Sequence, residues 1–169
     1  MCGAREAPAI ARMYGRNTGS RWRDRGAHAI ATAVSNATPH LYPIPVDPSD
    51  IDFMGHVNNA SYLKWVQDAV IDHWRSLAPA DAVAQHLWVA LKHEITYRRP
   101  TFLGDDVIAT VLLEKFQGAR AFYDTVIKRG EDVLAEVRSS WCCVDATTLR
   151  PARLARDIVE RFLPATVSE

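Results

Sequence analysis

Ten consecutive residues, from Asp50 to Asn59, combine the side chains that acyl-group chemistry uses. The run DIDFMGHVNN supplies two carboxylates, one imidazole and two amides. A carboxylate can attack a carbonyl carbon or remove a proton from water, and an imidazole can assist either step. This loop is therefore the strongest candidate for a catalytic site in the sequence.

The loop leads directly into a long amphipathic helix. Apolar side chains recur at helical spacing from Tyr62 to Leu77, and Asn58 or Asn59 can cap the first turn. The first turn of a helix carries free N–H groups and about half a positive charge, so it can hold a carbonyl oxygen on which negative charge develops. Gly55 in the loop would let a ligand or the backbone approach closely.

One strand is predicted before this helix and four after it. Residues 41–46 are β-capable and contain two prolines, which suits an edge or terminal strand. Later runs with strand character are 88–97, 107–113, 121–128 and 133–144. In the first of these, strict alternation would place Val89, Leu91 and His93 on one face. A short amphipathic helix ends the chain at 154–162. A central helix this apolar needs a sheet wrapped around it.

Length and charge exclude several classes of protein. The 169 residues suit one domain, and 20 basic residues balance 20 acidic ones, so no net field attracts nucleic acid or an anionic membrane. No apolar run approaches the ~20 residues that a membrane span needs. Three cysteines without metal-binding spacing predict a reducing compartment and no structural zinc site.

Residues 1–39 differ from the rest in composition. They are rich in Ala and Arg, carry six arginines against two acidic residues, and show no sustained apolar period. Such a segment is typical of a mitochondrial transit peptide, but also of a disordered bacterial extension or a start codon placed too early. We expect a disordered extension over 1–39 and one folded domain over 40–169. The expected location is the cytoplasm, or the mitochondrion if the source is eukaryotic.

The run DIDFMGHVNNASYLKWVQ resembles the signature of the 4-hydroxybenzoyl-CoA thioesterase-like branch of hotdog-fold acyl-CoA thioesterases. It is also similar to the corresponding stretch of plant acyl-carrier-protein thioesterases. The resemblance continues through YRRPTFLGDDV and DATTLRPARL and covers roughly residues 41–163. It implies an α+β hotdog fold, in which an antiparallel sheet of about five strands wraps around one long central helix, with a short C-terminal helix.

The resemblance also implies roles for individual residues. Asp52 falls on the catalytic carboxylate, and Asn59 falls on the position whose backbone amide polarises the thioester carbonyl. His56 matches a histidine of the plant enzymes, whose catalytic Asn is replaced here by Met54; His56 then assists, positions, or is a buried structural residue. Arg120 and Arg150 align with basic residues that hold the nucleotide phosphates.

We therefore expect an enzyme that hydrolyses an acyl-CoA thioester, without a metal or cofactor, as a homodimer or homotetramer with the site at the subunit interface. Asp52 would act as nucleophile or general base. Gly55, Asn58 and Tyr62 are further expected substrate-binding residues, although Asn58 also suits a helix cap and Tyr62 a core position. Two alternatives stay open: a hotdog enoyl-thioester hydratase or dehydratase, and a non-catalytic acyl-CoA-binding protein.

Overall fold

The computed structural model describes residues 36–164, so most of the predicted extension over 1–39 lies outside the described residues. The elements, in chain order, are β1 (His40–Ile44), the 3₁₀ turn η2 (Pro48–Asp50), α1 (Asn59–Leu77), α2 (Ala80–Gln85), β2 (His86–Tyr97), β3 (Val107–Gln117), β4 (Arg120–Arg129), β5 (Asp132–Asp145) and α3 (Arg156–Phe162).

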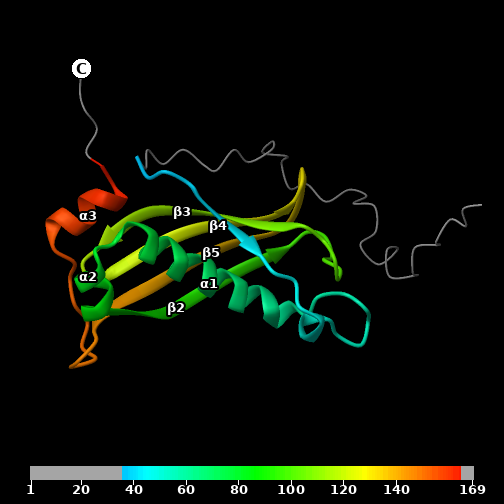
Figure 1. The fold of residues 1–169 in the computed structure, drawn as a ribbon, viewed down its shortest axis with the longest axis horizontal. Helices are drawn as coiled ribbons and strands as arrows, with labels where there is room; N and C mark the ends of the chain where they lie inside the picture. The colour runs from blue at the N-terminus through cyan, green and yellow to red at the C-terminus, as the bar shows by residue number, and fades with distance from the viewer. Residues whose placement is uncertain (1–35, 165–169) are drawn as a thin grey trace, which may run out of the picture. The chain divides into compact units, whose positions relative to one another are not determined.

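The five strands form one antiparallel sheet in the order β1-β3-β4-β5-β2. The sheet curves, and α1 runs across its concave face, while α2 and α3 lie near the C-terminal end of α1 (Figure 1). This arrangement is the predicted hotdog fold, with the predicted central helix and short C-terminal helix.

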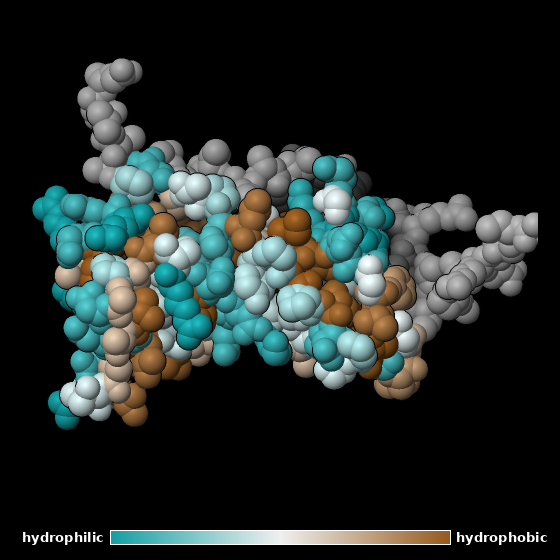
Figure 2. Space-filling model, in the orientation of Figure 1, coloured by the Kyte–Doolittle hydropathy of each residue, from teal (hydrophilic) through white to brown (hydrophobic). Residues whose placement is uncertain are grey.

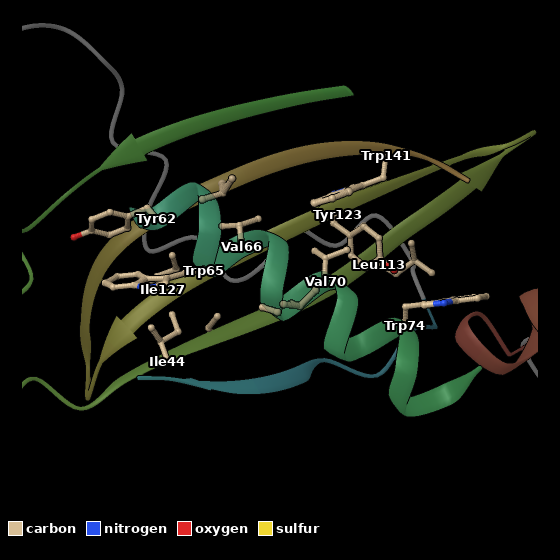
Figure 3. Close-up of a cluster of buried hydrophobic side chains, with 14 of the residues drawn as sticks. Ile44, Tyr62, Trp65, Val66, Val70, Trp74, Leu113, Tyr123, Ile127 and Trp141 are labelled. Atoms are coloured by element: carbon tan, nitrogen blue, oxygen red, sulfur yellow. The ribbon is translucent and has the colours of Figure 1, made fainter. Parts of the chain in front are cut away.

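The core lies between α1 and the concave face of the sheet. The helix buries one face, whose side chains are related by steps of three and four residues: Tyr62, Trp65, Val66, Ala69, Val70, His73 and Trp74. Figure 3 shows several of them pointing toward Leu113, Tyr123, Ile127 and Trp141 on the strands. Burying one stripe of a helix and one face of a sheet against each other removes both apolar surfaces from water.

Strict alternation along β2 was the wrong expectation at one point. The pairing of β2 with β5 shifts register between Ala90 and Lys92, which is the signature of a β-bulge. The bulge inserts one extra residue, so Trp88 and Ala90 lie on the same face as His93 instead of the opposite one. That shared face is the inner one, because the β5 partners of these residues are buried.

The two edges of the sheet differ. The edge strand β1 has five residues and includes Pro43, which has no N–H to offer a neighbouring strand. The edge strand β2 has twelve residues, and its large apolar side chains Leu87, Val89 and Leu91 are exposed. A long apolar edge of this kind can pair with another chain.

Candidate active site

The DIDFMGHVNN run forms a small hairpin directly before α1. Ile51 and Val57 pair as an isolated antiparallel bridge, and the N–H of Asp52 donates to the carbonyl of His56 at 2.9 Å. The N–H of Gly55 closes the turn on the carbonyl of Asp52 at 3.0 Å. Gly55 has φ +80°, a left-handed conformation that side chains with a Cβ rarely adopt, so glycine is required for this turn.

Asp52 has one engaged and one available carboxylate oxygen. Its Oδ1 accepts a hydrogen bond from the N–H of Met54 at 2.8 Å, which fixes the orientation of the carboxylate. Its Oδ2 lies 3.8 Å from Nδ1 of His56, beyond hydrogen-bond distance, and accepts no hydrogen bond from residues 36–164. The side chain is 12% exposed, so it is sheltered but not sealed from solvent.

His56 is buried beside this carboxylate. Its Nδ1 lies 3.1 Å from the carbonyl oxygen of Val57. A carbonyl can only accept, so this contact places the proton of a neutral ring on Nδ1 and leaves the lone pair on Nε2.

Asn58 is the N-cap of α1. Of the two predicted candidates for the cap, Asn58 and Asn59, the first is therefore confirmed. Its Oδ1 accepts from the N–H of Ala60 at 2.8 Å, and its carbonyl accepts from the N–H of Ser61 at 3.0 Å. Within residues 36–164, no acceptor takes the N–H of Asn59. The first residue of α1 thus keeps an unpaired donor at the positive end of the helix.

Asp50 belongs to the preceding turn. Its Oδ2 accepts from the N–H of Asp47 at 3.0 Å, completing a capping box around η2, and its carbonyl accepts from the N–H of Asn58 at 2.7 Å. Asp50 therefore supports the base of the hairpin, whereas Asp52 lies beyond it toward the tip.

Thr101, which the sequence reasoning did not single out, joins the hairpin to the rest of the domain. Its carbonyl accepts from the N–H of Val57 at 2.8 Å, and its Oγ1 lies 2.7 Å from the hydroxyl of Tyr62. The hydroxyl of Tyr97 donates to the carbonyl of Asn59 at 3.0 Å. Both Thr101 and Tyr62 are buried. The segment after β2 and the start of α1 are thus held together by side-chain hydroxyls.

Tyr62 lies in the core, where Figure 3 shows it near the start of α1. Its ring meets Trp65 and Tyr97 at centroid distances of 4.9 and 5.2 Å. Of its two expected roles, the structure therefore shows the core position, and its contact with substrate stays a prediction.

Arg120 and Arg150 lie at the opposite end of the sheet. Arg120 begins β4 and pairs with Cys142, whereas Ile127 pairs with Ala135, the β5 partner of Tyr97. Seven residues of strand separate Arg120 from Ile127, about 23 Å at ~3.3 Å per residue. One protomer therefore does not bring these arginines to Asp52, and both side chains are exposed.

A cavity of about 730 Å³ lies near the C-terminal half of α1. Its lining includes Ile71, Trp74 and Arg75 of α1, and Trp88 of β2. Asp52 does not line it, so the cavity and the hairpin are separate features of the single protomer.

Two kinds of feature are absent from the part of the chain that the structure describes. Within 36–164, no three His, Cys, Asp or Glu side chains are grouped as a metal site would need. No helix in that range combines the length and apolar character of a membrane span.

The sequence pattern of the thioesterase-like superfamily matches residues 46–162, which includes the hairpin, α1 and the whole of the sheet after it. The chain belongs to this superfamily. It is thus a thioester hydrolase, as the resemblance implied.

Individual relatives agree with this assignment. The long-chain acyl-CoA thioesterase FadM of Escherichia coli K12 is 28% identical over 119 residues, which are 66% of this chain and 88% of FadM. A thioesterase of Thermus thermophilus, solved with coenzyme A and Zn, is 26% identical with a TM-score of 0.64, over 72% of this chain and 95% of its own. The probable thioesterase YbaW of E. coli is 25% identical with a TM-score of 0.59, over 74% and 98%.

Proposed function

We propose that this chain hydrolyses acyl-CoA thioesters to a free carboxylic acid and coenzyme A, with Asp52 as the reacting carboxylate. The observation that carries the proposal is the available Oδ2 of Asp52, in a hairpin that leads directly to the unpaired N–H of Asn59. The long-chain acyl-CoA activity of FadM and the coenzyme A bound to the Thermus thioesterase support a CoA thioester as substrate.

Two routes use the same carboxylate oxygen. As a general base, Oδ2 removes a proton from water while the water oxygen attacks the thioester carbon, and the tetrahedral intermediate expels CoA thiolate. As a nucleophile, Oδ2 attacks the carbon itself and CoA thiolate leaves, giving a mixed anhydride that water then hydrolyses. In both, the N–H of Asn59 and the positive end of α1 stabilise the carbonyl oxygen as it gains charge.

His56 is proposed as an assisting residue. With its Nδ1 proton directed at the carbonyl of Val57, the ring keeps a fixed orientation beside Asp52. Its Nδ1 lies 3.8 Å from Oδ2, too far for a hydrogen bond, which supports a positioning role for His56 more than direct proton transfer.

A second copy of this chain is the proposed partner of β2. Antiparallel pairing of two β2 edges about a two-fold axis would satisfy their unpaired backbone groups and cover Leu87, Val89 and Leu91. The same pairing sets the Tyr97 end of one strand beside the His86 end of the other. The hairpin of one protomer then shares an end of the joint sheet with the arginine-bearing end of its partner.

This homodimer supports the proposed roles of Arg120 and Arg150. Arg120 pairs with Cys142, which pairs in turn with Val89 near the start of β2. The partner's copies of these arginines would therefore lie closer to the hairpin than the protomer's own, where they could bind the nucleotide phosphates. We place the protein in the cytoplasm, or in the mitochondrion if the source is eukaryotic, on the strength of its composition.

Thiol release from acetyl-, decanoyl- and benzoyl-CoA by the full chain tests the proposal. Wild type is expected to turn over at least one of these substrates, and Asp52→Asn to be slower by ~100-fold or more, the usual effect of losing a base or nucleophile. Asp50→Asn is the matched control, because Asp50 only supports the turn and an amide oxygen can still accept from Asp47. An Asp52→Asn variant of unchanged rate would retire this mechanism.

The same preparation separates the two alternative functions. Hydration of crotonyl-CoA without thiol release would indicate the enoyl-thioester hydratase. Tight binding of an acyl-CoA, measured by calorimetry, without release of thiol from any substrate would indicate the non-catalytic binding protein.

A further inference from the structure

Two turns of the same design lie side by side at the end of the domain that carries Asp52. In each, two apolar residues precede a left-handed glycine: Phe53-Met54-Gly55 with φ +80° at the glycine, and Phe102-Leu103-Gly104 with φ +86°. The 2.8 Å hydrogen bond between Val57 and Thr101 joins the segments that carry the two turns, and Figure 1 shows both loops at that end.

Each turn is held by an aspartate of its own. Oδ1 of Asp52 accepts from the N–H of Met54, and Oδ2 of Asp105 accepts from the N–H of Phe102 at 2.9 Å. Asp105 is fixed in turn by an ion pair with Arg129, with 2.6 Å between Nη1 and Oδ2. The apolar residues are therefore displayed on constrained turns rather than on free loop.

The four apolar side chains are exposed although the core is close by. Phe53 is 96% exposed and Leu103 is 55% exposed, and Met54 and Phe102 are also exposed. Figure 2 shows apolar residues among polar ones at this end of the molecule. Because these side chains stay exposed, they contribute little to folding. Burying them against a binding partner would stabilise the complex by about 25 cal/mol per Å² of apolar surface.

The charges around the turns restrict the kind of partner. Four acidic residues lie in or beside the two turns: Asp50, Asp52, Asp105 and Asp106. The arginines at this end are engaged: Arg129 by Asp105, and the pair Arg98 and Arg99 by Glu136 and Asp132. An anionic membrane surface or an acidic carrier protein would meet repulsion here, whereas an uncharged hydrocarbon would not.

We propose that Phe53, Met54, Phe102 and Leu103 form an apolar collar that contacts the hydrocarbon chain of the substrate and so selects long acyl chains. The collar rests on the proposed thioesterase function, since it assigns a role in substrate selection to residues beside Asp52. Phe53 and Met54 belong to the hairpin that carries Asp52, so the proposal places the first methylenes of an acyl chain, whose thioester carbon lies at Oδ2, against these side chains. Contact with the collar also displaces water from the mouth of the site.

The collar predicts a loss that depends on chain length. Phe53→Ser and Leu103→Ser are each expected to lower kcat/KM for decanoyl-CoA about tenfold, which equals about 1.4 kcal/mol or the burial of roughly two methylenes. For acetyl-CoA, whose acyl group has no methylene, the change is expected to stay within about twofold. Leu41→Ser is the matched control, because Leu41 is 62% exposed but lies on β1, and it should alter neither value.

Other outcomes overturn the collar. Equal losses of kcat/KM on both substrates would mean that the turns only support Asp52. Unchanged kcat/KM on both substrates would mean that the collar does not contact the substrate. Loss of the dimer in Phe53→Ser, seen by light scattering, would assign the turns to a subunit interface. Loss of co-sedimentation with phosphatidylcholine vesicles at unchanged kcat/KM would assign them to a lipid surface. Wild type that releases no thiol from any acyl-CoA would instead overturn the proposed function itself.

Discussion

The two ends of α1 are stabilised by different interactions. At the N-terminal end, hydrogen bonds that involve Val57, Tyr62 and Tyr97 tie the neighbouring loops to the helix. At the C-terminal end, aromatic rings pack: Trp74 stacks on Phe162 at a centroid distance of 5.4 Å and meets Trp88 edge-on at 5.6 Å.

Hydrogen bonds and packing do different things for the protein. A hydrogen bond fixes the direction and distance of a polar group, which is what a reacting carboxylate requires. Buried aromatic rings supply much more stability but orient no polar group toward substrate. We therefore expect the N-terminal end of α1 to orient the candidate carboxylate and the C-terminal end to contribute most of the stability, and three variants can test that difference.

Trp74→Ala addresses the packed end and should have the largest effect. Removing a buried indole leaves a cavity beside Phe162, and we expect the free energy of unfolding in urea to fall by about 3–5 kcal/mol. Thiol release per folded molecule should stay within about twofold of wild type. Phe53→Ala is the control, since a side chain that is 96% exposed should change stability by less than about 0.5 kcal/mol. Similar losses in the two variants would contradict the division.

His73 gives the packed end a pH dependence. It lies between His40, Tyr123 and Phe162, and burial, with a smaller contribution from His40, lowers its pKa from 6.5 to about 4 although Asp72 opposes this. The folded pKa is the lower one, so the stability contributed by the neutral ring is complete above pH 6.5. It is lost as the pH falls toward 4.

The corresponding measurement compares wild type with His73→Leu in urea at pH 7 and pH 5. At pH 5 the unfolded chain binds a proton at this site and the folded chain does not, which costs wild type about 2 kcal/mol relative to pH 7. Between pH 7 and pH 5, the free energy of unfolding of His73→Leu should therefore fall by about 2 kcal/mol less than that of wild type. Equal losses in the two proteins would show that groups other than His73 set the acid sensitivity.

Thr101 addresses the hydrogen-bonded end, where the expected change in stability is smallest. Thr101→Val removes the hydroxyl that meets Tyr62 but leaves the carbonyl that holds Val57, and should lower the free energy of unfolding by about 1 kcal/mol. We expect kcat to fall about tenfold with KM within about twofold, because the loop that carries Asp52 is positioned less well.

Thr101→Ser is the control for this position. It restores the hydroxyl and should restore kcat, which a loss of packing alone would not do. If Thr101→Val has the kcat of wild type, the hydroxyl pair is structural and the carbonyl of Thr101 is sufficient to hold the hairpin.

Most of the fold could be predicted because its pattern is local and periodic. The buried face of α1 repeats at helical spacing, and the strands after it alternate. Two features have no such signal. The six residues of α2 are too few to establish a period, and the bulge after Ala90 depends on how β2 fits β5, a partner some fifty residues away.

The candidate site also has residues that the sequence could predict and one that it could not. Asp52, His56 and Asn58 are close in sequence, so their placement in one hairpin before the helix could be predicted, and the cap at Asn58 is confirmed. The sequence did not indicate Thr101, because its partners Val57 and Tyr62 are about forty residues away. No local pattern around Thr101 predicts these contacts. The catalytic roles of Asp52 and Asn59 stay predictions for the kinetic tests.

The open side of β2 has a practical consequence for anyone who purifies the protein. The outward-facing amides and carbonyls of this twelve-residue strand, beside exposed leucine and valine side chains, can pair with an extended segment of another chain, including a partly denatured copy. Heating or dilution that frees this strand should therefore produce precipitate before complete unfolding, and a lysine introduced at Val89 should delay it.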